Sequence, residues 1–237
     1  MKKLVLVMLW LSAIPLSWSQ SISKIDFDAV KKEVQDSSSE YYYSKLFKKM
    51  LHVDSTLSSQ EYKHLYYGNV YQKYYQPYGI SNLKKSLTEQ YKLKDYDKVL
   101  EIGKTVLEEN PVDLEVLLKM SIASLKLGNE DEKHFYANHY YSLLDVIYNS
   151  GDGREMNSAY VVISVDHEYQ ILGDLGLRAI EQHLITDCDL LKFRRTDQEK
   201  VKGRKKVKAL YFNVRMPLMS LSTTYKDADL PDPDEED

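Results

Sequence analysis

The chain has 237 residues, 43% hydrophobic and 29% charged, so it is long enough and apolar enough to bury a core of its own. Its single cysteine excludes a small scaffold held together by internal disulfides. With 32 Lys and Arg against 36 Asp and Glu, it lacks the excess of basic residues that a protein gripping duplex nucleic acid needs, so no nucleic-acid partner is expected.

The first residues have the pattern of a secretory signal peptide. Basic residues precede an apolar stretch from Leu4 to Ile14, and the small residues Ser17 and Ser19 place cleavage after Ser19. The apolar stretch is shorter than the roughly 20 residues of a membrane-spanning helix. We therefore expect an exported protein, periplasmic or extracellular, with no transmembrane anchor after cleavage.

The next segment is predicted to be helical. Apolar residues on one face indicate a helix from about Asp26, and a second apolar stripe covers Tyr43–Leu51. Ser58 and Glu61 have the spacing of a capping box, in which each residue's side chain binds a free backbone amide of the other. A third helix is therefore expected to begin at about Ser59.

The stretch "EYKHLYYGNVYQKYYQPYG", residues 61–79, holds seven tyrosines. Gly68 weakens the helix and Pro77 ends it, so the segment can pass from helix into loop and turn. Several aromatic and apolar residues fit one helical stripe, namely Tyr67, Val70, Tyr71, Tyr74, Tyr75 and Tyr78. Seven exposed rings would form a larger apolar surface than soluble proteins normally carry, so packing is favoured. The alternative is a binding platform that includes Tyr71, Tyr74 and Tyr75.

The strongest helical signal runs from Leu83 to Ile147. Three apolar stripes follow one another, and Asn110-Pro111 and Gly128-Asn129 separate them. Because these connections are short, neighbouring helices should be antiparallel.

Beyond residue 153 the pattern changes to that of a small sheet. Strands are expected at "AYVVISV", "LRAIEQHLI", "CDLLKFRR" and "VKALYFNVRM", with a short helix at "DHEYQILGDLG" capped by Asp166. In the last strand, alternate residues should face the core, namely Leu210, Phe212, Val214 and Met216.

Three parts are therefore expected after the signal peptide: a helical domain at 20–150, a sheet domain at 151–221 and a disordered acidic tail at 222–237. The basic loop 194–208 is interpreted as a solvated hairpin tip, with an anionic partner or lipid headgroup as the alternative.

The segment "DYDKVLEIGKTVLEENPVDLEVLLKMSIASLKLGN" resembles a tetratricopeptide repeat. The match is in spacing, through Tyr96, Val99, Gly103, Val106 and Pro111, although Gly103 stands where that family has a bulky residue. The resemblance implies an α+β protein in which tetratricopeptide-like helical hairpins precede a small, mainly antiparallel sheet with one helix.

Residues from about 25 to 221 are also similar to an uncharacterised family of exported bacterial proteins. The similarity rests on phrases such as "LYYGNVYQKYYQPYG", "GDGREMNSAYVVISVDHEYQIL" and "ALYFNVRMPL". That family has no assigned activity, so the resemblance implies export and the layout of helices and sheet, but no chemistry.

No catalytic motif stands out. The sequence has no G-x-S-x-G, and Ser81-x-x-Lys84 lacks the motifs that accompany S-x-x-K in known enzymes. Cys188 is expected to be a buried, inert thiol. Two pairs with metal-ligand spacing, Glu61-x-x-His64 and Asp131-x-x-His134, are expected on helix surfaces, so neither a metal nor another cofactor is predicted.

Binding is therefore the favoured function, through a protein or peptide partner. The resemblance implies a concave surface built from the first helix of each hairpin, which gives Glu115, Lys119, Ile122 and Lys126 as candidate contacts. A purely structural place in an envelope assembly is a further possibility.

The main alternative is an exported hydrolase or glycan-handling protein. It would use the acid and histidine residues between 152 and 168, namely Asp152, Asp166, His167 and Glu168. A pocket where such acids converge would favour an enzyme.

Overall fold

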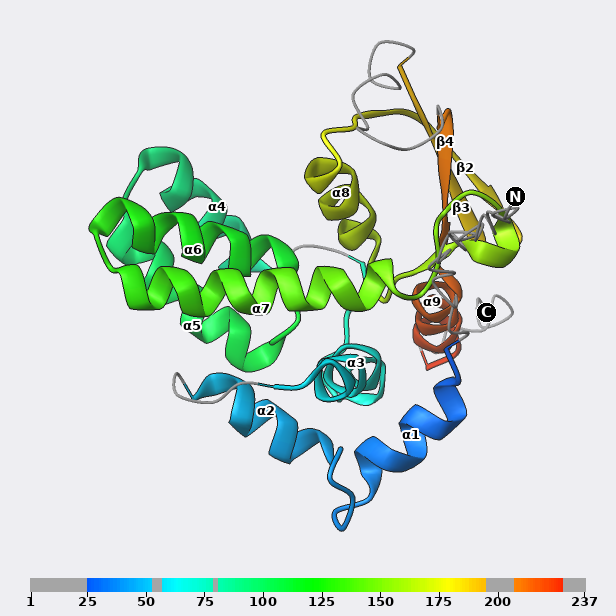
Figure 1. Ribbon diagram of the computed structural model, residues 1–237, viewed down its shortest axis with the longest axis horizontal. Helices are drawn as coiled ribbons and strands as arrows, with labels where there is room; N and C mark the ends of the chain where they lie inside the picture. The colour runs from blue at the N-terminus through cyan, green and yellow to red at the C-terminus, as the bar shows by residue number, and fades with distance from the viewer. Residues whose placement is uncertain (1–24, 53–56, 79–80, 195–206, 228–237) are drawn as a thin grey trace, which may run out of the picture.

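In a computed structural model, which describes residues 25–52, 57–78, 81–194 and 207–227, helices come first and a small sheet follows (Figure 1). The helices are α1 (Phe27–Gln35), α2 (Tyr43–Leu51), α3 (Ser59–Gly68), η1 (Asn69–Tyr71), α4 (Asn82–Leu93), α5 (Tyr96–Glu109), α6 (Leu114–Leu127), α7 (Glu130–Tyr148), η2 (Met156–Ser158), α8 (Val165–Asp174) and α9 (Arg215–Asp227). The strands are β1 (Tyr160–Val161), β2 (Ala179–Ile185), β3 (Cys188–Phe193) and β4 (Ala209–Asn213). The predicted α+β class is confirmed.

Local capping sets the starts of the first helices. The Asp26 side chain accepts a hydrogen bond from the Ala29 amide at the start of α1. At the start of α3 the predicted capping box forms, because the Ser58 amide donates to Glu61 Oε2 at 2.7 Å and the Glu61 amide donates to Ser58 Oγ at 3.3 Å.

The helix in the tyrosine-rich segment ends earlier than a single helical stripe reaching Tyr78 would require. α3 ends at Gly68 and one 3₁₀ turn follows, so Tyr74 and Tyr75 lie outside any helix. Tyr66 and Tyr67 are fully buried, whereas Tyr74 is 64% exposed. The segment therefore passes from helix into loop and turn, as expected from Gly68 and Pro77, and the tyrosines beyond Tyr71 do not continue the helical stripe.

Helices α4 to α7 form two successive hairpins in which each helix packs on the next, shown in green at the left of Figure 1. The residue that departs from the repeat pattern, Gly103, has a structural role here. A Cβ atom at Gly103 would lie 2.4 Å from Met120 Sδ, so the absence of a side chain lets α5 and α6 approach closely.

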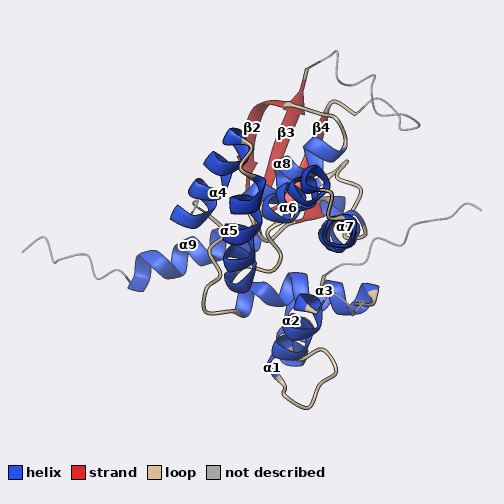
Figure 2. Cartoon of the chain, turned by 90° about the vertical axis from the view of Figure 1, so that its left-hand side faces the viewer, coloured by secondary structure: helices blue, strands red, loops and turns tan. Residues whose placement is uncertain are grey.

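The sheet has the order β1-β4-β3-β2, and two of its three pairings are antiparallel. β1 pairs parallel with β4 over only two residues, so the "AYVVISV" run forms much less strand than expected. Leu191 and Phe212 are fully buried on the inner face of the sheet. Helix α8 lies between the hairpins and the sheet (Figures 1 and 2).

The chain end differs from the expectation. Strand β4 stops at Asn213, so Met216 belongs to α9 rather than to the strand. The Asn213 side chain accepts a hydrogen bond from the Arg215 amide at 3.1 Å, and Pro217 lies in the first helical turn, where its missing N–H is tolerated. Helix α9 continues through residues 222–227, inside the range expected to form the tail.

Several expectations fall on residues that the structure does not describe. The signal peptide lies within 1–24, most of the basic loop within 195–206 and the end of the acidic tail within 228–237. Within the described ranges, none of the helices combines the length and apolar character needed to cross a lipid bilayer.

The helical part and the sheet share one hydrophobic core. Buried residues from α1 through β4 belong to a single cluster, and Tyr148 of α7 meets Tyr160 of β1 edge to face at 5.7 Å between ring centroids. The predicted boundary near residue 150 is thus crossed by continuous packing.

Phe212→Asp is expected to lower the free energy of unfolding by roughly 3 kcal/mol or more, because it places an unpaired charge at a fully buried position. Asn213→Asp is the matched control, since Asp keeps the side-chain oxygen that accepts from the Arg215 amide. Thermal unfolding followed by circular dichroism measures both. Equal melting temperatures for Phe212→Asp and the parent would contradict the assigned buried face.

Candidate functional site

Two of the predicted contact residues lie side by side between α4 and α6. The Lys119 ammonium binds Glu115 Oε1 at 2.6 Å and donates to Thr88 Oγ1 at 2.8 Å. It also lies 5.7 Å from the centre of the Tyr91 ring. Farther along α6, Ile122 is half-buried and Lys126 is exposed.

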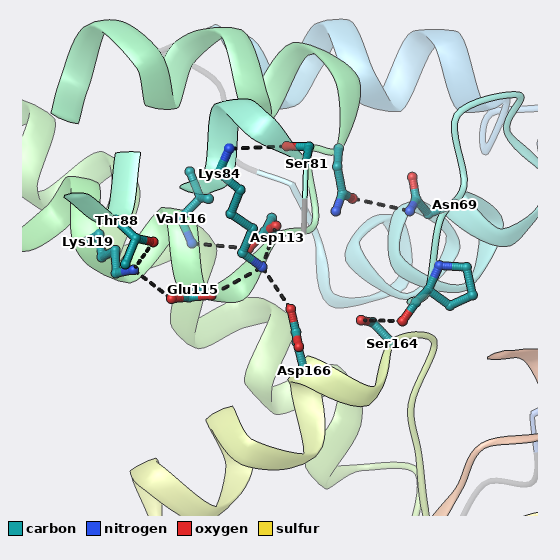
Figure 3. Close-up of polar contacts among 12 residues, drawn as sticks. Asn69, Ser81, Lys84, Thr88, Asp113, Glu115, Val116, Lys119, Ser164 and Asp166 are labelled. Atoms are coloured by element: carbon teal, nitrogen blue, oxygen red, sulfur yellow. Dashed lines mark hydrogen bonds and ion pairs between the residues drawn. The ribbon is translucent and has the colours of Figure 1, made fainter. Parts of the chain in front are cut away.

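A buried lysine forms the centre of the site. Lys84 Nζ lies 3.0 Å from Asp113, 3.2 Å from Glu115 and 2.9 Å from Asp166. These groups come from α4, from the cap and first turn of α6, and from α8 (Figure 3). We call Lys84, Asp113, Glu115 and Asp166 the Lys84 cluster.

The N-termini of three helices meet at this cluster. Ser81 caps α4 by accepting from the Lys84 amide at 3.1 Å, and Asp113 caps α6 by accepting from the Val116 amide at 3.1 Å. Ser164 precedes α8 and donates to the Pro77 carbonyl at 3.2 Å (Figure 3). Helix N-termini stabilise negative charge, which favours the carboxylates gathered here.

The Lys84 cluster keeps its lysine charged. Burial alone lowers the pKa of Lys84, but the carboxylates of Asp113, Asp166 and Glu115 outweigh burial and raise it above its ordinary value. Burial raises the pKa of Asp113 despite the adjacent Lys84. Because Lys84 stays protonated and Ser81 Oγ is occupied by a backbone amide, the Ser81-x-x-Lys84 pair cannot act as a nucleophile with its base.

A small cavity of about 150 Å³ opens beside the Lys84 cluster. Its lining includes Tyr74, Glu109, Asp166 and His167. The Asp166 side chain is 45% exposed, and Glu109 is also exposed. The cavity therefore has an acidic mouth beside the exposed ring of Tyr74.

His167 is buried beneath the cavity. Its Nδ1 shares a 2.8 Å hydrogen bond with the Tyr66 hydroxyl. Burial, together with the nearby positive charge of Lys84, lowers the pKa of His167 to about 3. The imidazole is therefore neutral at physiological pH and fixed by the core.

Glu168 is fully buried, and the described residues offer its carboxyl oxygens no hydrogen-bond donor. Burial, reinforced by the Asp189 carboxylate, raises the pKa of Glu168 to about 9. Asp189 is itself buried and accepts a 2.7 Å hydrogen bond from Gln182 Nε2. Glu168 is therefore a neutral acid inside the joint between α8 and the sheet.

Of the four residues of the predicted acid and histidine group, Asp166 and His167 line the cavity, and Asp152 and Glu168 do not. Asp152 accepts from Ser158 Oγ at 2.6 Å and from the Arg154 amide at 3.0 Å, and it does not line the cavity. Asp166 does not cap α8, because Ser164 occupies that position and Asp166 instead pairs with Lys84.

The candidate metal pairs are engaged in other contacts. Glu61 pairs with Lys49 at 2.7 Å, and His134 lies 3.7 Å from Glu130. Among the residues described, no group of three or more potential ligands could hold a metal ion. Burial, with the Asp187 carboxylate, raises the pKa of the Cys188 thiol to about 11, so this thiol stays protonated.

The candidate tyrosines separate into two roles. Tyr71 donates to the Phe27 carbonyl at 2.8 Å and Tyr75 donates to the Ile163 carbonyl at 2.6 Å, so both bind other parts of the core. Only Tyr74 among these three lines the cavity.

The central residues of the site were not predicted as such. Lys84 was considered only through the S-x-x-K pattern, and Asp113 was not singled out at all. Asp113 can nevertheless be recognised from the sequence as a helix cap, because it is an aspartate placed just after Pro111 and before an apolar helical stripe.

Fold and site together define an α+β protein whose helical hairpins join a small sheet through a buried ion cluster. Residues 28–222 match the model of a domain of unknown function (DUF4919). The match covers most of the chain, so the chain belongs to this family, in agreement with the expected uncharacterised family. No curated protein and no solved structure matches it.

Lys84→Met is expected to lower the free energy of unfolding by about 3–5 kcal/mol, because it leaves the buried Asp113 carboxylate without its counter-charge. Denaturant unfolding at neutral pH measures the change. The matched control is Lys98→Met, which removes an exposed pair with Glu101 and should change stability little. Similar stabilities of the two variants would show that the Lys84 cluster does not hold the helices together.

Glu168→Gln is expected to remove a pH dependence of stability. The pKa of Glu168 is raised in the folded chain from 4.5 to about 9, so folding favours its protonated form. The parent should therefore lose stability relative to Glu168→Gln as the pH rises from about 4.5 to about 9. Above about pH 9 the difference in stability should stay constant. Denaturant unfolding of both proteins at about pH 5 and about pH 9 tests this. A constant difference would contradict a neutral Glu168.

Proposed function

We propose that this is an exported, non-catalytic binding protein that holds a segment of a partner protein against α4, α6 and the start of α8. In this proposal the signal peptide ends after Ser19 and α4 to α7 act as tetratricopeptide-like hairpins. The observation that carries the proposal is the acidic cavity, whose buried groups are paired or neutral while its mouth stays open to solvent.

The charge of the cavity favours a basic group on the partner. Lys84 contacts three carboxylates, whereas Lys119 offsets only one of them, Glu115. Glu109 adds a further acid at the lining. A lysine or arginine side chain would supply the missing positive charge, and the exposed Tyr74 ring could flank it through a cation–π contact.

The size of the cavity also favours the end of a side chain over a larger ligand. Its volume is about 150 Å³, whereas sites for drug-sized molecules and cofactors occupy roughly 300–1,000 Å³. The remainder of a peptide would then lie along α6, over Lys119, Ile122 and Lys126.

The hydrolase alternative has weaker support. A carboxyl group with a strongly raised pKa is typical of active sites, and Glu168 has one. Glu168 is nevertheless fully buried and does not line the cavity, and His167 is held neutral by the core. A general acid or base must reach the reacting atom, which the buried Glu168 cannot do. His167 lines the cavity, but it is bonded to Tyr66 and its lowered pKa makes it a weak base.

The proposal predicts that peptides selected on the mature chain are enriched in lysine or arginine. Tyr74→Ala and Glu109→Gln should each weaken binding of a selected peptide, Glu109→Gln by about tenfold, with unchanged melting temperatures. Calorimetric titration measures the affinities. Both substituted side chains are exposed, so folding should be preserved.

Tyr141→Ala is the matched control, because Tyr141 is 57% exposed on α7 and does not line the cavity. It should bind the peptide as the parent does. Selected peptides without basic residues, or equal affinity of all three variants, would contradict the proposed site.

A further inference from the structure

Among the described residues, strand β2 forms an unpaired edge of the sheet. In that part of the chain it is last in the order β1-β4-β3-β2 and pairs with β3 alone, as the red strands of Figure 2 show. Every residue from Ile180 to Ile185 is exposed. The exposed fractions of Ile180, Leu184 and Ile185 are 50%, 56% and 36%.

Two of the usual protections of an edge strand, proline and lysine, are absent from β2. Natural edges often carry proline, lysine or a bulge that prevents pairing with another chain. β2 contains neither proline nor lysine, and its one irregularity lies at its start, between Ala179 and Glu181. The stretch from Glu181 to Ile185 therefore presents regular backbone that can hydrogen-bond to a further strand.

The sequence of β2 is complementary to itself. It reads A-I-E-Q-H-L-I, in which two apolar residues, an acid, an amide, a base and two apolar residues follow one another. If two copies pair antiparallel about a two-fold axis at Gln182, Glu181 lies opposite the partner's His183. Gln182 then lies opposite the partner's Gln182, and the regular register ends at Glu181, where the bulge begins.

We propose that β2 is a dimerisation strand and that its partner is β2 of a second copy of this chain. A two-fold interface requires a surface that is complementary to itself, which the pattern about Gln182 satisfies. The two four-stranded sheets then join into one continuous sheet. Backbone hydrogen bonds supply the attachment, and the matched side chains fix the register.

Contacts within one chain already hold the edge in place. On one face, Glu181 binds Lys192 Nζ at 2.9 Å and His183 Nε2 at 3.1 Å. On the other face, Gln182 accepts from the Tyr169 hydroxyl and donates to Asp189, both at 2.7 Å. A preorganised edge loses little conformational freedom on pairing. This inference does not depend on the proposed peptide site.

Sedimentation analysis of the full mature chain over a concentration series should show a monomer–dimer equilibrium. Leu184→Lys should abolish the dimer, because a lysine on an edge strand opposes pairing with another chain. The matched control is Leu125→Lys on α6, where the side chain is 48% exposed, and this variant should dimerise as the parent does. A parent that stays monomeric, or a Leu184→Lys dimer, would overturn the proposal.

The register is tested by charge exchange. Glu181→Lys alone replaces the acid opposite the partner's His183 with a base, and His183→Glu alone places two carboxylates opposite one another, so each should pair less well than the parent. Mixing the two proteins restores opposite charges at both positions and should produce a heterodimer. Absence of the heterodimer, when the parent dimerises, would overturn the pairing about Gln182.

Disulfide trapping gives a second measure of the register. Gln182→Cys places two thiols at opposed positions, where Cα atoms lie about 4.5–5.5 Å apart and a disulfide can form. His183→Cys places them diagonally, about 7–8 Å apart, and should cross-link much more slowly. Native Cys188 is buried at 2% exposure and should contribute little. Faster cross-linking of His183→Cys would contradict the proposed two-fold axis.

Discussion

One buried ammonium group, Lys84 Nζ, joins three elements that are distant in the chain. Its bond to Asp166 spans 82 residues, and its contacts with Asp113 and Glu115 tie α4 to α6. Removing charges from water is costly, so a buried ion cluster is a poor source of stability by itself. Misplacing one partner, however, leaves an uncompensated charge. The arrangement of α4, α6 and α8 therefore depends on this lysine being fully surrounded.

The tyrosines supply hydrogen-bond donors to the buried backbone where the helical part meets the sheet. The segment around β1 is buried but pairs with β4 over only two residues, so its other polar backbone groups need partners. Tyr67 donates to the Val161 carbonyl at 3.3 Å and Tyr75 to the Ile163 carbonyl at 2.6 Å. Phenylalanine would fill the same space without supplying these donors. Tyrosine is therefore used here for packing and hydrogen bonding together, while Tyr74 remains exposed.

Local features of the fold could be predicted from the sequence, and distant pairings could not. The capping box at Ser58 and Glu61 and the apolar stripes of α5 to α7 depend on residues within a few positions of each other. The end of β4 was missed because alternation continues through Val214 while the backbone already turns. The Lys84 cluster was missed because no local pattern indicates that a lysine on α4 will meet a carboxylate on α8. Asp166 was recognised as a helix-start residue, but its actual partner is on another element.

Contacts made by the first turn of α8 fix the position of the helical part relative to the sheet. Four consecutive residues there contact four different places: Asp166 binds Lys84, His167 bonds to Tyr66, Glu168 lies beside Asp189, and Tyr169 donates to Gln182 of β2. Successive side chains on an α-helix point about 100° apart, so one turn can face every surrounding element. Any rotation of α8 about its axis would disturb all four contacts together. The acidic cavity and the free edge of β2 are therefore held by the same turn of one helix.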